Sequence, residues 1–113
     1  MPGTERWSHT FTRTSRQLEW PNPFSPSGRE HDLRSMLEAA RRGAQVVRDQ
    51  RYEIRNLFAK EENVLAELDW SATPAVDTPK YPAGHTLRAH VAMVFRLEGG
   101  RIRHITNYDC YEP

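Results

Sequence analysis

Cysteine, lysine and long apolar runs are the scarcest features of this sequence. Cys110 is the only cysteine among 113 residues, so an internal disulfide cannot form, and no neighbouring cysteine or histidine completes a metal-ligand motif. This predicts a reducing compartment and no metal or other cofactor. No segment approaches the roughly 20 apolar residues that cross a bilayer, and the polar N-terminus lacks the apolar core of a signal peptide. We therefore expect a cytoplasmic protein that does not enter a membrane.

An excess of charge of one sign is also missing. Arginine and lysine number 16 and aspartate and glutamate number 15, which leaves a formal net charge of +1. The basic residues are dispersed along the chain instead of forming a stripe, so a nucleic-acid partner is not expected. With 113 residues, the chain is long enough for one domain with a modest core.

The first part of the chain has little periodicity. Residues 1–18 mix hydroxyl, arginine and aromatic side chains and are expected to be irregular, although residues 9–14 could extend as a strand. Residues 19–113 are expected to form the folded domain. This domain begins with a stiff loop that contains three prolines. Trp20 and Phe24 in this loop should pack on the core or at the mouth of a pocket.

The clearest local prediction is an amphipathic helix over residues 28–42. Ser27 and Glu30 have the spacing of a capping box. Gly43 is a natural stop, because glycine adopts the backbone conformation that often ends a helix. Apolar residues recur at helical spacing and form one stripe, which consists of Leu33, Met36, Leu37 and Ala40.

Four extended segments follow the helix. A polar turn at residues 60–63 separates the first two, and a proline-containing loop over residues 74–84 precedes the third. A Gly99-Gly100 turn of the primed type joins the last two. The segments are residues 45–58, 64–73, 86–97 and 101–111. This order predicts an α+β fold in which a strongly curved, mixed or antiparallel sheet packs on one helix.

The final hairpin divides its side chains between two faces. Counting outward from a two-residue turn at Gly99-Gly100, directly opposed residues share a face. One face is mainly apolar, and the second face places His90 opposite Asp109. A single bulge would exchange the two faces beyond it. The mainly apolar face is expected to line the interior, and its polar members are His104, Thr106, Tyr108 and Cys110.

Two sets of residues on this hairpin are candidates for acid–base chemistry. A carboxylate beside an imidazole raises its basicity, so Asp109 with His90 could act as a general base, or the pair could be a structural ion pair. His104 with Tyr108 is the rival set, and only one face can meet a ligand. Side chains that could wall a ligand pocket are Trp20, Phe24, Trp70, Met93, Phe95 and Asn107.

The order of these segments resembles the SnoaL-like branch of the nuclear-transport-factor-2-like superfamily. That branch contains polyketide cyclases, ketosteroid isomerases and limonene epoxide hydrolases. The resemblance covers about residues 19–112. It is carried by Glu19-Trp20-Pro21, residues 51–54, 67–73, 82–84 and 95–102, and Asn107-Tyr108-Asp109.

The resemblance implies a cone-shaped sheet with an apolar pocket at its open end. The implied function is binding of a small apolar molecule, with a cofactor-independent cyclase, isomerase or hydrolase activity. The alternative is a non-catalytic dimerisation or ligand-binding module. Family members often pair through the outer sheet face, so a homodimer or higher homo-oligomer is expected.

The sequence also departs from the family pattern. Members usually begin with two helices that cap the cone, and residues 1–18 do not resemble them. Ketosteroid isomerase-like sites have acids where this chain has Trp20 and Met93. Cyclase-like and epoxide-hydrolase-like members place an acid on the last strand, where this chain has Asn107, with Asp109 two residues later.

Overall fold

The computed structural model describes residues 7–77 and 81–113. Six strands form one sheet in the order β2-β1-β6-β5-β4-β3. β1 and β6 are parallel and all other neighbours are antiparallel, so the sheet is mixed. The elements are β1 Phe11–Glu19, β2 Arg29–Asp32, α2 Leu33–Val46, β3 Val47–Lys60, β4 Asn63–Pro74, β5 Leu87–Glu98 and β6 Arg101–Tyr111.

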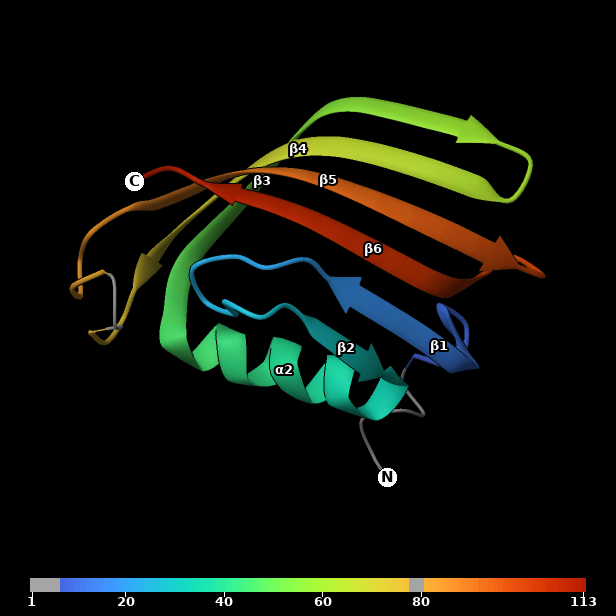
Figure 1. Cartoon of the computed structure of the whole chain (residues 1–113), viewed down its shortest axis with the longest axis horizontal. Coiled ribbons are helices and arrows are strands. Elements are labelled where there is room, and N and C mark those ends of the chain that lie inside the picture. The colour runs from blue at the N-terminus through green and yellow to red at the C-terminus, as the bar shows by residue number, and fades with distance from the viewer. Residues whose placement is uncertain (1–6, 78–80) are drawn as a thin grey trace.

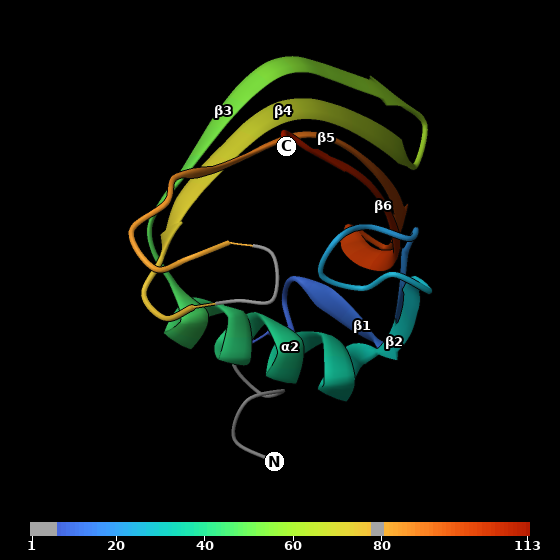
Figure 2. The ribbon, with the colours of Figure 1, turned by 60° about the vertical axis from the view of Figure 1, so that its left-hand side comes forward.

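The sheet is strongly curved, with α2 lying across its open side. Figure 1 shows the strands side by side from β3 at one edge to β2 at the other, with α2 next to β1 and β2. Turned by 60°, the same ribbon arches over α2 and leaves a concave face toward the helix (Figure 2). This arrangement confirms the predicted α+β fold with a curved sheet packed on one helix.

The helix begins later and ends later than the sequence predicts. Asp32 caps it by accepting a 2.8 Å hydrogen bond from the backbone N–H of Ser35. The predicted capping residue Ser27 is not used, because residues 29–32 pair with β1 as strand β2. Gly28, at φ +72°, turns the chain into that strand. Gly43 lies inside α2, which continues to Val46.

The predicted apolar stripe of the helix packs only in part. Met36 is buried, and Leu33 and Leu37 are half-buried. Ala40 is exposed, as are residues 41–45 that follow it in the helix.

The N-terminal strand β1 is the largest difference between the structure and the sequence-based prediction. Residues 11–18, expected to be irregular, form most of this strand between β2 and β6. Ser15 at its centre is only 1% exposed, and its Oγ lies 2.6 Å from the carbonyl oxygen of Ile102 and 2.8 Å from that of Thr12. Within the described part of the chain, α2 is the only helix, so none precedes β1 in residues 7–10.

The hydrophobic core lies on the concave face of β4 and β5. Ala66 and Leu68 are buried and Val64 and Trp70 are half-buried, so these alternate residues form the inward face of β4. On β5, the buried residues are Leu87, Ala89 and Val91.

The pairing of β5 with β6 contains a bulge that changes the predicted faces. Glu98 pairs with Arg101 and Leu97 with Ile102, as expected from the Gly99-Gly100 turn. The next pair is Arg96 with His104, so Arg103 is an extra residue on β6. Beyond this point every residue of β6 has exchanged faces relative to the prediction. The concave pairs are therefore Phe95/Ile105, Met93/Asn107 and Val91/Asp109, and the outer pairs are Arg96/His104, Val94/Thr106, Ala92/Tyr108 and His90/Cys110.

Candidate functional site

The concave face carries a pocket of about 240 Å³. It lies where β3, β4, β5 and β6 run side by side. Apolar side chains form its floor, and polar groups from β6 enter at one end. Three of the residues that the sequence suggested as pocket walls line it, Trp70, Met93 and Asn107, together with the predicted acid Asp109.

Asp109 is the acid of this pocket. Its side chain is partly buried, and this burial raises the pKa of the carboxyl group above the usual aspartate value. The nearby carboxyl of Glu19 raises this pKa further, whereas a hydrogen bond from Asn107 lowers it. Among the described residues, no lysine, arginine or histidine forms an ion pair with Asp109. The pocket therefore contains a carboxyl group without a compensating cation.

Asn107 connects this acid to the N-terminal strand. It is 8% exposed, and its Oδ1 accepts a 2.8 Å hydrogen bond from Nε2 of Gln17. This leaves its amide N–H groups free to donate to the carboxylate of Asp109. The hydrogen bond from Gln17 therefore holds Asn107, the neighbour of Asp109 on the concave face of β6.

A second polar cluster lies beside Asp109. Nε2 of the buried His31 lies 3.4 Å from Oε2 of Glu19, and Nδ1 lies 3.1 Å from Oγ of Ser35. Sequence reasoning missed Glu19 and His31 as site residues. His31 lies inside the helix that the sequence predicts, and Glu19 comes near Asp109 only because parallel pairing aligns it with Asn107.

Trp70 and Tyr111 form an aromatic wall of the pocket, and Phe24 contacts Tyr111 without lining the pocket itself. The ring of Tyr111 lies 5.0 Å from that of Phe24 and 6.1 Å from that of Trp70, centroid to centroid. Phe24 also stacks on Tyr81 at 5.8 Å. Burial, reinforced by nearby carboxyls, raises the pKa of Tyr111 far above its ordinary value, so its hydroxyl stays protonated.

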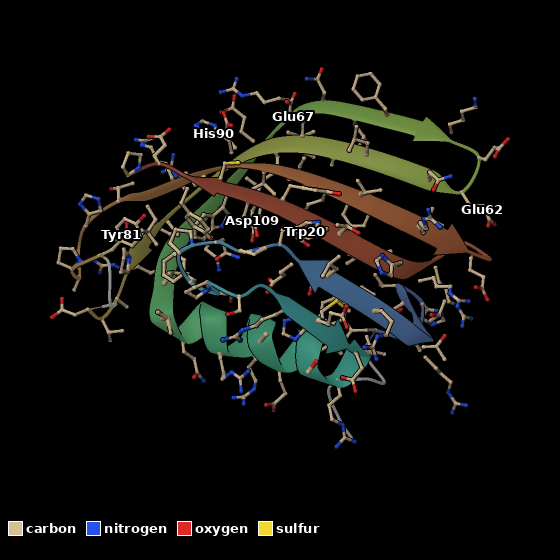
Figure 3. All side chains as sticks on the ribbon, viewed as in Figure 1. Trp20, Glu62, Glu67, Tyr81, His90 and Asp109 are labelled. Atoms are coloured by element: carbon tan, nitrogen blue, oxygen red, sulfur yellow. The ribbon has the colours of Figure 1, made fainter. Side chains whose placement is uncertain are left out.

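His90 lies on the opposite side of the sheet from Asp109, so the predicted pairing of the two does not form (Figure 3). Instead, its Nδ1 lies 2.9 Å from Oδ1 of Asp69 and its Nε2 lies 2.9 Å from Oε2 of Glu112. Hydrogen bonds to Asp69 and then Glu112 raise the pKa of His90. Both ring nitrogens are occupied by carboxylates, which suits an exposed structural clamp that attaches Glu112 to the sheet.

This clamp borders a hollow of about 870 Å³ on the outer face. Its lining includes ion pairs, for example Arg55 with Asp69 at 2.8 Å. These charged side chains are exposed to water and already satisfied, so the concave pocket offers the more reactive environment despite its smaller volume.

The rival set also lies outside. His104 and Tyr108 share a face as predicted, but the bulge places that face on the outside of the sheet. Tyr108 is 47% exposed, and its ring stacks on that of Trp20 with 6.3 Å between centroids. Phe95 shares the concave face with Met93 but lies nearer the hairpin turn, beyond the lining of the pocket.

The sequence model of the SnoaL-like domain matches residues 4–105. Among curated proteins, none matches the chain in sequence.

Three solved structures illustrate the structural similarity. A predicted polyketide cyclase from Acidithiobacillus ferrooxidans has 24% identity and a TM-score of 0.71, with 93% of this chain and 74% of that chain covered. IdmH, a predicted polyketide cyclase from Streptomyces antibioticus, has 13% identity and a TM-score of 0.76, with 96% and 81% covered. AclR, a predicted hydroxylase from Streptomyces galilaeus, has 16% identity and a TM-score of 0.72, with 95% and 67% covered. At these identities the similarity concerns the fold.

No three side chains of histidine, cysteine, aspartate or glutamate in residues 7–77 and 81–113 are grouped so that they could hold a metal ion. In the same residues, no helix has the length and apolar character needed to cross a membrane.

Proposed function

The chain belongs to the SnoaL-like domain family, and we propose that it binds a small, mostly apolar molecule on its concave face and moves a proton with Asp109. The observation that carries this proposal is the partly buried carboxyl of Asp109, which faces an apolar and aromatic pocket without a cation partner in the described residues. A carboxylate held away from water is a stronger base than one in solution.

The proposed reaction class is cofactor-independent proton transfer at carbon. Ring closure of a polyketide, the reaction named for two of the similar structures, begins when a base removes a proton next to a carbonyl group. Asp109 lines the pocket beside Asn107, which Gln17 holds by a hydrogen bond. Isomerisation and hydrolysis need the same kind of group, so substrate shape decides among these outcomes.

A model reaction tests the base without knowledge of the substrate. In nitrobenzisoxazole, a base removes the proton on the ring carbon beside nitrogen, the C–H electrons form a nitrile, and the N–O bond breaks to release a coloured phenolate. We expect the protein to accelerate this reaction and Asp109→Asn to reduce the acceleration about 100-fold, the lower range for a general base. The rate should rise with pH as Asp109 ionises, with a midpoint above its normal pKa of 3.8.

The matched control is Glu67→Gln, which makes the same chemical change on the outer face of the sheet. Glu67 is exposed, and the backbone pairs it with Ala92 on the side away from the pocket (Figure 3). This variant should keep the full rate. An equal loss in both variants, or none in Asp109→Asn, would remove Asp109 from the proposed mechanism.

A non-catalytic binding or dimerisation module is the second candidate. The observation that favours it is an exposed apolar row on the concave side of β3, where Tyr52, Ile54 and Leu57 are 64%, 61% and 62% exposed. Such a row usually marks an interaction surface, so we propose a homodimer or higher homo-oligomer. Sedimentation of the wild type and of an Ile54→Ser/Leu57→Ser variant tests this candidate. If the row is an interface, the wild type should sediment with a larger mass than the variant.

A further inference from the structure

The concave pocket combines aromatic walls with a single charge. Of the described residues that line it, Asp109 alone is charged, and three are aromatic: Tyr52, Trp70 and Tyr111. The remaining lining is apolar or uncharged. No basic side chain of the described chain lines the pocket, so nothing in the lining attracts an anionic ligand.

Two carboxyl groups, those of Asp109 and Glu19, make this end of the pocket negative. Glu19 acts electrostatically on both Asp109 and Tyr111, and in each case its effect on the pKa is that of a neighbouring negative charge. Glu19 has His31 as its neighbour at 3.4 Å, whereas Asp109 has no cation in the described residues. A positive ligand group would therefore supply the counter-charge that the fold leaves out.

The aromatic rings are held in place before any ligand arrives. Oε1 of Gln50 accepts hydrogen bonds from the hydroxyl of Tyr52 at 3.1 Å and from Nε1 of Trp70 at 3.2 Å. Tyr111 is held by ring contacts with Phe24 and Trp70. The faces and edges of fixed rings can receive a ligand without a cost for ordering them.

We propose that the ligand of this pocket carries a cationic amine or ammonium group, which contacts the rings of Trp70, Tyr111 and Tyr52 and faces the carboxylate of Asp109. Aromatic faces attract cations electrostatically, most strongly where water is excluded. The volume of about 240 Å³ lies below the usual range for drug-sized ligands, so the molecule is a small amine with an apolar body. This inference rests on the pocket of the proposed function and adds the ligand class.

A charged and a neutral ligand of the same shape test this proposal. Benzyltrimethylammonium carries a permanent positive charge, and neopentylbenzene is its neutral carbon isostere. Binding is followed by shifts of the backbone amide NMR signals of Trp70 and Tyr111 during titration at neutral pH. We expect the ammonium to bind at least tenfold more tightly than the isostere.

Variants separate the contribution of the Asp109 carboxylate from that of the Trp70 ring. Asp109→Asn should remove most of the preference for the ammonium, Trp70→Leu should weaken ammonium binding, and Trp70→Phe should restore part of it. The outer-face variant Glu67→Gln should leave the preference unchanged, which excludes a general effect of net charge. Amide NMR spectra of each variant establish that the fold is retained.

The outcomes distinguish this inference from the proposed function. Equal or tighter binding of neopentylbenzene would overturn the ammonium inference and leave the apolar pocket of the proposed function intact. A preference that persists in Asp109→Asn would also overturn it. If neither ligand shifts the pocket signals, both the inference and the pocket are wrong.

Discussion

Deletion of Arg103 should destabilise the protein by about 3 kcal/mol or more, because it removes the extra residue of the β6 bulge. Without that residue, the backbone pairing would turn Ile105 and Asn107 outward and bring Thr106 and Tyr108 inward. Ile105 is 5% exposed, and loss of one such buried side chain costs roughly 1.5–3 kcal/mol on its own. Equilibrium unfolding in urea measures the change.

The matched control keeps the extra residue and removes only its side chain. Arg103 forms an exposed ion pair with Glu98 at 2.8 Å, and such pairs contribute about 0–1 kcal/mol. Arg103→Ala should therefore unfold within about 1 kcal/mol of the wild type. A deletion variant as stable as Arg103→Ala would contradict the bulge and the faces that depend on it.

Leu87→Ala should lower the free energy of unfolding by about 2–4 kcal/mol, because it leaves a cavity where a fully buried side chain packs. Leu87 begins β5, pairs with Ala72 on β4 and is 2% exposed. Thermal and urea unfolding of the purified variant provide the measurement.

Leu65→Ala is the comparison for this core variant. Leu65 lies on the outer face of β4 and is 40% exposed, so its truncation should cost about 1 kcal/mol or less. Equal costs for the two variants would mean that the concave side of β4 and β5 is not the main core.

The strands of the second half of the chain could be predicted from local patterns. Alternating apolar residues and the Gly99-Gly100 turn placed β4, β5 and β6 within a residue or two of their bounds. The bulge was missed, although the sequence contains a signal for it. Ile102 and Ile105 are three residues apart, and both can face inward only if one residue between them is extra.

The N-terminal half depends on contacts that local patterns do not encode. Both Ser27 and Asp32 suit a helix cap, and pairing of residues 29–32 with β1 decides between them. β1 is hard to predict from the sequence because a polar residue, Ser15, occupies its buried central position. That burial is possible only through hydrogen bonds to backbone carbonyl groups of Thr12 and β6.

The candidate site was therefore predicted in part. Asp109, Asn107, Met93 and Trp70 were named from the sequence and line one pocket. Glu19 was not, because only the parallel pairing of β1 with β6 brings it near Asp109. The two residues are 90 positions apart in the chain, the same separation as between Gln17 and Asn107. Such long-range pairing has no signature in either strand alone.

The titration of Asp109 tests the central claim most directly, because the proposed base and the proposed counter-charge are the same carboxyl group. Its pKa can be followed by the NMR shift of the side-chain carboxyl carbon, in the wild type and in Glu19→Gln. We expect a pKa above the normal 3.8, raised by burial and by Glu19, and a lower value in Glu19→Gln. A pKa at or below 3.8, unchanged by Glu19→Gln, would contradict an uncompensated carboxyl group in the concave pocket.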